Sequence, residues 1–288
     1  MNLLIVLLLG TIDITSGSLE IEKVGGKMKY FLKNGVTLTF DSTVVTADEG
    51  IYFIDEKWGK LYGHVRLKTP SYSVNADSLI YFEEGNRTVF RLNVSGMDST
   101  ALFEAKDVVV KGDTACASGE VNIFIVNDSI NFSGDSAVYF LNLKKGKLFG
   151  NAEAHLIDTV KLKSDSLGFK KDTLLAWGNV SITSKKFTGK SLELEYSRNG
   201  ESSAKVTLIG NSVFEAGETH VEGDTLEFEL SGGEVRFATF KGSPVMRTNR
   251  DSGYLVVESD TMQVEMQGDS LVFFEATGSV RGEFVENE

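Results

Sequence analysis

Apolar and polar residues alternate along most of this chain, in short segments that each begin with a glycine. The clearest copies cover residues 35–38, 63–67, 119–123, 150–154 and 178–182, and the pattern continues at 210–213 and 278–280. A period of two places every second side chain on the same face of an extended strand. These segments therefore predict β-strands with one buried face.

A second kind of segment follows about a dozen residues after most of these glycines. Each copy contains small residues, an Asp, a Ser or Thr, and a pair of apolar residues. The copies lie at 74–81, 132–139, 162–169, 221–228 and 257–262. Weaker copies lie at 45–48 and 105–107, and the copy at 187–192 has Lys190 where Asp is expected. The first five aspartates stand 28 to 30 residues apart, and later units are wider, at about 36: Asp48, Asp77, Asp107, Asp135 and Asp165.

The alternation changes phase inside this second segment. Val74 and Ala76 precede Asp77 at one parity, whereas Leu79 and Tyr81 follow it at the other. A regular strand cannot place both sets on one face, so the pattern predicts a bulge or sharp bend at the aspartate. We expect one within a residue or two of each of five aspartates: Asp77, Asp135, Asp165, Asp224 and Asp260.

Composition agrees with a chain built of strands. The sequence has 29 Gly, 19 Phe and 8 Tyr but only 2 Pro and 1 Cys, a balance typical of strands joined by glycine turns. A repeated corner folds each unit across two facing sheets, and stacked units share one apolar interior. We therefore expect an all-β protein, one elongated open structure of repeated antiparallel strand pairs, over residues 18–288.

The paired segments resemble the OstA-like repeats of the periplasmic lipopolysaccharide-transport bridge proteins, the LptA-type β-jellyrolls, over roughly residues 30–285. The resemblance implies an open β-jellyroll whose interior binds lipid acyl chains and whose terminal strands pair edge to edge with neighbouring jellyrolls. This chain departs from the short bridge proteins in its length, in its wider C-terminal repeats and in Lys190 at a corner. Those departures leave open which component of a transport chain it is.

The interior residues are the candidate site. By parity they line the interior whether it is packed solid or admits a ligand, and the resemblance implies that they bind acyl chains. The candidate lipid-binding residues are Val65, Leu67, Leu79, Tyr81, Val121, Ile123, Tyr139, Val180, Ile182, Leu192, Leu226 and Phe228.

The N-terminal segment predicts export. Residues 3–9 are an unbroken apolar run, too short to span a membrane, and a Ser/Gly-rich stretch follows at 15–18. We expect residues 1–17 to be a signal peptide, although a basic start is missing; the alternative is a buried first strand. The resemblance and the leader together imply a periplasmic protein.

Charge narrows the classes of partner. The net charge is −12, which is unfavourable for binding the phosphates of nucleic acids, so no nucleic-acid partner is expected. Residues 144–190 differ from the rest of the chain, because this segment contains ten lysines and four acidic residues. This basic segment is either a solvated face or a rim that meets anionic headgroups.

The sequence offers little for catalysis or cofactors. The three histidines, His64, His155 and His220, are out of phase with the apolar positions, so we expect them to face solvent and to bind no metal. Glycine-flanked serine and phosphate-loop motifs are absent, and the lone Cys116 excludes an internal disulfide. The repeated aspartates are equal copies, which favours structural corners over a catalytic pair. We expect no enzyme activity and no cofactor.

The implied partners are lipopolysaccharide, through its lipid A acyl chains, the jellyroll components of the transport system at the inner and outer membranes, and further copies of this chain. Strand-like residues at both ends, 28–40 and 271–282, predict head-to-tail association. Two other functions stay open at this point. One is a structural or adhesive β-solenoid with a solid core and no ligand, which would have closed rungs of parallel strands. The other is a polysaccharide-degrading β-helix, which would have convergent carboxylates on one exposed face.

Overall fold

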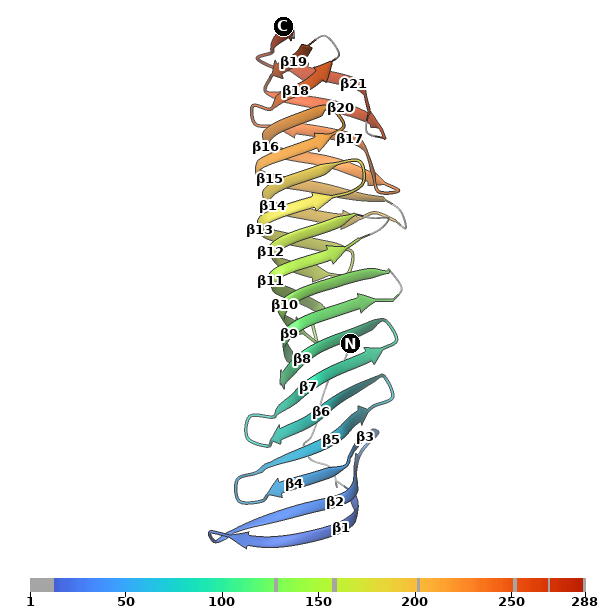
Figure 1. Ribbon diagram of the computed structural model, residues 1–288, viewed down its shortest axis with the longest axis vertical. Helices are drawn as coiled ribbons and strands as arrows, with labels where there is room; N and C mark the ends of the chain where they lie inside the picture. The colour runs from blue at the N-terminus through green and yellow to red at the C-terminus, as the bar shows by residue number, and fades with distance from the viewer. Residues whose placement is uncertain are drawn as a thin grey trace. The chain divides into compact units, whose positions relative to one another are not determined.

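The computed structural model describes residues 13–126, 129–156, 160–200, 203–250, 253–268 and 270–286. Every regular element among these residues is a β-strand (Figure 1). Every strand pairing described for them is antiparallel. The predicted all-β fold of antiparallel strand pairs is confirmed. Within the described ranges, no helix is long and apolar enough to cross a membrane.

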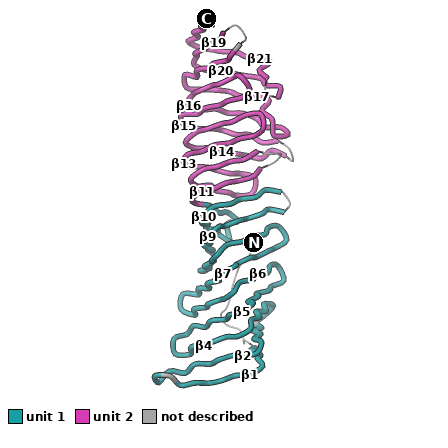
Figure 2. Tube along the Cα trace, in the orientation of Figure 1, with its two compact units in different colours: residues 1–148 teal, residues 149–288 magenta. Residues whose placement is uncertain are grey.

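The chain divides into two compact units, residues 1–148 and 149–288 (Figure 2). Unit 1 contains β1 (Asp13–Val24), β2 (Lys27–Phe40), β3 (Thr43–Ala47), β4 (Glu49–Phe53), β5 (Trp58–Lys68), β6 (Tyr72–Phe82), β7 (Arg87–Asp98), β8 (Ala101–Lys111), β9 (Thr114–Ile125) and β10 (Ile130–Phe140). The boundary falls inside β11 (Lys145–His155).

Unit 2 has longer strands first and shorter strands last. They are β12 (Lys161–Lys170), β13 (Thr173–Thr183), β14 (Thr188–Arg198), β15 (Ser203–Ala216), β16 (Thr219–Ser231), β17 (Glu234–Lys241), β18 (Val245–Arg250), β19 (Gly253–Glu258), β20 (Thr261–Gln267), β21 (Ser270–Thr277) and β22 (Arg281–Glu286). The predicted extent of the repeat domain, 18–288, stays a prediction.

Each long strand bends once near its middle, and this corner folds the sheet into two facing layers. In β5 the register shifts between Tyr62 and Val65, and the two residues between them, Gly63 and His64, have φ of 73° and 46°. Gly63 has a further reason to be glycine, because a Cβ there would collide with the Asp48 carboxylate. Gly178 stands in the same relation to Asp165 in unit 2. The repeated Gly and Asp are therefore two halves of one corner.

The predicted bends are confirmed. Register shifts lie at Asp77, Asp135, Asp165 and Asp224, and Asp260 lies between β19 and β20. Side-chain amides complete several corners: Asn93 Nδ2 donates to Asp77 at 2.8 Å and Asn179 Nδ2 donates to Asp165 at 2.9 Å. In the weaker copy at 105–107 the aspartate is offset by one residue from the corner, because Lys106, rather than Asp107, faces the corner glycine Gly119.

At one end of each unit the two layers separate into different strands. In unit 1, β2 pairs through residues 29–32 with β4, in what we call the first layer, and through 36–40 with β3, in the second layer. In unit 2, β16 pairs through 225–231 with β17, in the first layer, and through 219–222 with β18, in the second. β20 and β21 extend the first layer, whereas β19 and β22 extend the second. Separate short strands explain the wider C-terminal repeats.

Candidate ligand-binding site

Unit 1 encloses an apolar cavity of about 260 Å³ between its two layers. The second layer and β1 contribute Ile14, Leu38, Val45 and Leu67, and the first layer contributes ten residues. The first-layer residues are Leu32, Ile51, Tyr52, Gly59, Lys60, Leu61, Leu79, Tyr81, Glu83 and Thr88. An engineered apolar cavity of about 150 Å³ binds benzene. This cavity can therefore hold a segment of an acyl chain.

The corner in β5 explains how one strand lines both sides of the cavity. Leu61 precedes the corner and Leu67 follows it, six residues later, and both reach the same interior. In a straight strand, residues an even number apart share a face, so the side chains of Leu61 and Leu67 would point in the same direction from well-separated places. They could not then lie on opposite sides of one cavity. The fold at Gly63 and His64 turns them toward one space. The interior is thus a product of the corner and not of either strand half alone.

A polar edge borders the cavity on the side of the β4–β5 and β6–β7 turns. The Tyr52 hydroxyl donates to Glu83 Oε1 at 2.6 Å. Burial, followed by that hydrogen bond to the carboxylate, raises the pKa of Tyr52 to about 12. Burial also raises the pKa of Tyr81, which lines the same edge. The polar atoms of these two neutral phenols and of the carboxylate lie at the border of the cavity, and the cavity itself is apolar.

The cavity reaches the surface at β1. Ile14 lines it and is 55% exposed, and Leu19 and Ile21 of the same strand are also more than half exposed. All three side chains lie in register with interior residues of β2: Leu38, Leu32 and Tyr30. The pairing described for β1 is the antiparallel one with β2. Ile14 therefore places one border of the cavity at this exposed strand.

Three of the predicted site residues line the cavity: Leu67, Leu79 and Tyr81. Val65 and Val121 are 1% exposed, and Ile123 and Tyr139 are half-buried, but none of these four belongs to the cavity wall. In unit 2, Val180, Ile182, Leu226 and Phe228 are at most 2% exposed. The void described there is only about 10 Å³, close to the smallest space that holds one water. The four unit 2 candidates are buried, and none of them lines this void.

The prediction that Leu192 lines the interior is wrong, because its side chain is 55% exposed. Ser191 is the buried residue before the corner and Leu194 the buried residue after it. Leu192 thus occupies the place that Asp77 holds in unit 1, and the corner glycine Gly210 packs against it. The corner residue of this copy is Leu192 and not Lys190, two positions earlier, and an offset of two leaves the alternation unchanged.

Sequence reasoning missed several wall residues, among them Leu38, Val45 and Leu61. Leu38 and Val45 lie within recognised repeat copies, so their parity could have identified them. Ile14 lies inside the predicted leader, where a strand was expected only as the alternative. The predicted leader overlaps the first residues of β1, while residues 1–12 lie outside the described part of the chain. Its cleavage stays a prediction.

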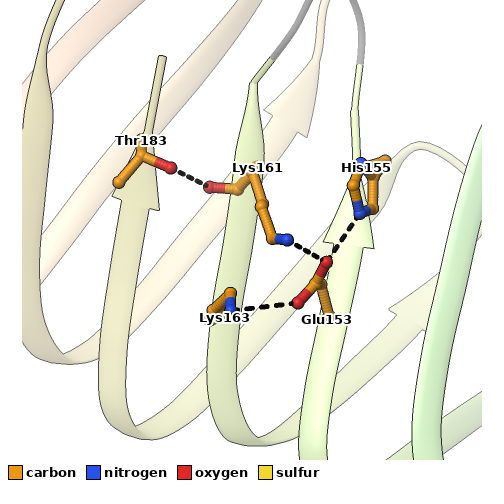
Figure 3. Close-up of polar contacts among 5 residues, drawn as sticks. All are labelled: Glu153, His155, Lys161, Lys163 and Thr183. Atoms are coloured by element: carbon orange, nitrogen blue, oxygen red, sulfur yellow. Dashed lines mark hydrogen bonds and ion pairs between the residues drawn. The ribbon is translucent and has the colours of Figure 1, made fainter.

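Charged residues lie on the outer surface. His64 and His155 are exposed and His220 is half-buried, and each bonds a carboxylate: Asp48, Glu153 and Glu222. Figure 3 shows His155, Lys161 and Lys163 gathered around Glu153. Burial alone would raise the pKa of Glu153, but hydrogen bonds from Lys161, His155 and Lys163 outweigh it and lower the pKa.

Lys161 and Lys163 belong to the basic segment, and here they neutralise an acidic neighbour on the solvated face. Among the described residues, no group of three or more His, Cys, Asp or Glu side chains could hold a metal ion.

Comparisons with known proteins add a fold neighbour. No known family model matches the chain, and no curated protein matches it. Among solved structures, the chain is similar to LptH from Pseudomonas aeruginosa, described as the LptA-homologous periplasmic component of the lipopolysaccharide transport device. The identity is 13% and the TM-score 0.37, over 39% of this chain and 93% of that one.

Proposed function

We propose that this protein is a periplasmic lipid carrier that shields acyl chains of lipopolysaccharide between the two layers of unit 1. The observation that carries the proposal is the apolar cavity, which borders the exposed strand β1 and is lined by Leu67, Leu79 and Tyr81. Each methylene removed from water contributes about 0.8 kcal/mol, so an apolar wall can hold a chain without ionic contacts. The sequence resemblance to lipopolysaccharide-transport repeats supplies the class of lipid.

The cavity is too small for a whole lipid with several chains. Its volume of about 260 Å³ is less than twice that of a cavity that holds one benzene. The exposed side chains of β1, Leu19 and Ile21, provide further apolar surface beside the opening. We therefore propose that one chain segment occupies the cavity while the rest of the lipid lies at the open end.

The same open end suits an edge-to-edge partner. β1, and not the 28–40 region named from the sequence, forms the edge of unit 1, because β1 covers β2 along most of its length. In unit 2, exposed apolar residues mark the last strands, Val272 and Phe273 on β21 and Phe284 on β22, at 50 to 55%. We propose that these different ends pair with jellyroll partners at the membranes or head to tail with further copies. Such transport requires no chemical step in this chain.

The test combines lipid co-isolation with a matched pair of variants. Val45 points into the cavity and is 3% exposed, whereas its neighbour Val44 points outward and is 36% exposed. We expect the secreted protein to bind the probe N-phenyl-1-naphthylamine, and we expect lipopolysaccharide to displace the probe. Val45→Trp should weaken binding about tenfold or more, because losing about two buried methylenes is enough for that. Val44→Trp should bind like the wild type.

Two results would contradict the proposal. The first is a secreted protein that carries no lipid and binds no probe. The second is equal loss of binding in the two tryptophan variants, which would mean that the wall of the cavity is not the site. Displacement of the probe by phospholipid but not by lipopolysaccharide would contradict the proposed class of lipid. It would still support the cavity as the binding site.

The β-solenoid alternative, which requires parallel strands, is disfavoured, since all described pairings are antiparallel. A solid core without ligand does fit unit 2, whose interior side chains are packed. We therefore restrict the carrier role to unit 1.

A further inference from the structure

Four phenylalanine rings meet inside unit 2. Phe187 lies in the turn between β13 and β14, Phe214 in β15, Phe228 in β16 and Phe240 in β17. Each is at most 4% exposed. We call this group the phenylalanine cluster. Its ring centroids lie 5.5 to 6.1 Å apart, at the separations of direct aromatic contact.

The cluster bridges the two layers of unit 2. Phe214 lies in the second half of β15, which pairs with residues of β16 in the second layer. Phe228 and Phe240 lie in the first layer, where β16 pairs with β17. The contacts of Phe214 with Phe228, at 6.1 Å, and with Phe240, at 6.0 Å, therefore cross the interior from one layer to the other. Rings that touch across the whole thickness leave no room between the layers for a chain.

Unit 1 has smaller or polar side chains at the equivalent positions. Counted from the corner glycine, Phe214 is the fourth residue after Gly210, and Leu67 is the fourth after Gly63. Phe240 is two residues before Gly242, as Leu61 is two before Gly63. Phe228 follows Asp224 by four residues, as Tyr81 follows Asp77. The three unit 1 residues, Leu61, Leu67 and Tyr81, all line the cavity.

We infer that the phenylalanine cluster is an internal stop for acyl chains, so that lipid bound by this protein does not run along the interior of unit 2. This inference rests on the proposed lipid-carrier function. The same repeat positions determine whether an interior admits a chain: leucine leaves space in unit 1, and phenylalanine closes it in unit 2. The bound acyl chains are therefore confined to unit 1, and the interior of unit 2 does not conduct them.

Exchanging residues between the units tests the stop. Phe214→Leu with Phe240→Leu gives unit 2 the residues of unit 1, and Leu61→Phe with Leu67→Phe does the reverse. The exposed Phe237→Leu, in the same strand as Phe240, is the matched control, because its side chain is 53% exposed and lies outside the interior. Binding of N-phenyl-1-naphthylamine and lipopolysaccharide is measured by fluorescence, and stoichiometry by native mass spectrometry.

We expect the unit 1 exchange to weaken wild-type binding about tenfold or more. Adding the unit 2 exchange to the unit 1 exchange variant should restore a single binding site. The control variant Phe237→Leu should neither weaken binding nor create a site. Full binding by the unit 1 exchange variant would overturn the inference, as would a folded unit 2 exchange variant that gains no site. Thermal melts verify folding, and Phe187→Leu, which changes a turn residue, replaces the double exchange if the latter does not fold.

Failure of the proposed function gives a different result. A wild-type protein that binds neither probe nor lipid contradicts the carrier role. A gain of probe binding in the unit 2 exchange variant would still show that the cluster closes an otherwise open interior.

Discussion

The two units use the same corner and the same alternation of strands but differ in what fills the space between their layers. Unit 1 holds a cavity of about 260 Å³, and the void described in unit 2 is about 10 Å³. The corners are alike: Gly63 faces Asp48 in unit 1 and Gly178 faces Asp165 in unit 2. The backbone repeat therefore sets the layers, and side-chain volume decides between a container and a core.

The largest expected difference between the units concerns the loss of a buried leucine. Leu67, on the cavity wall, is 1% exposed, and Leu208 in unit 2 is 0% exposed. We expect Leu208→Ala to lower the free energy of unfolding by about 4 kcal/mol and Leu67→Ala by about 2 kcal/mol, because a side chain beside a void has fewer contacts to lose. Denaturant unfolding monitored in each variant measures both values.

Equal costs in this leucine pair would mean that the cavity of unit 1 collapses or fills in solution. That outcome would remove the contrast between the two units. Filled and hollow interiors would then have to be distinguished by ligand binding alone.

A second pair tests what the units share. Gly63 and Gly178 both have φ of 73°, and a Cβ at either would collide with the facing aspartate. Gly63→Ala and Gly178→Ala should each cost about 1–3 kcal/mol, with no systematic difference between the units. Thermal melts compare them, with Gly282→Ala, where nothing lies near the added methyl, as the neutral control. A large cost at only one corner would contradict the view that the corners are equivalent.

The smallest expected effect is a dependence of stability on pH at the Gly63 corner of unit 1. His64 Nδ1 lies 2.8 Å from Asp48, and that hydrogen bond raises the pKa of His64 above its ordinary value of 6.5. The protonated ring stabilises the fold below pH 6.5, and this stabilisation is lost as pH rises through the raised pKa. At the unit 2 corner, Asn179 bonds Asp165 and does not titrate.

Melting temperatures measured at pH 5.5, 6.5 and 8 provide the check. Relative to His64→Asn, the wild type should be slightly more stable at the lowest pH and lose that advantage by the highest. Because the pair is exposed, the shift should shrink in high salt. A constant difference across the range would mean that protonation of His64 does not contribute.

Sequence pattern was sufficient for the layers and the corners. The change of parity around Asp77 and Asp165 predicted the bends, because a bulge there shifts the alternation of the residues that follow it. The pattern was insufficient where parity tolerates a shift of two, and so Leu192 was placed in the interior although it is exposed. Local alternation cannot distinguish such shifts.

Hollow and filled interiors could not be told apart from sequence either. Leu67 and Phe214 are both apolar residues at the same repeat position, and each alone fits a core or a groove. Closure depends on three or four rings from distant strands, such as Phe187 and Phe240, meeting at one level between the layers. That meeting is a property of the assembled volume and not of any one segment.

The order of strand pairing bears on how proteins of this kind change length. From β5 to β10 and from β12 to β16, each strand pairs with the next strand in the chain. Removing a single strand would reverse the direction of every later one and misalign glycine with aspartate at each corner. Removing two consecutive strands would preserve both. Duplication or deletion in evolution is therefore expected to proceed by whole hairpins, each lengthening or shortening the interior by one corner pair.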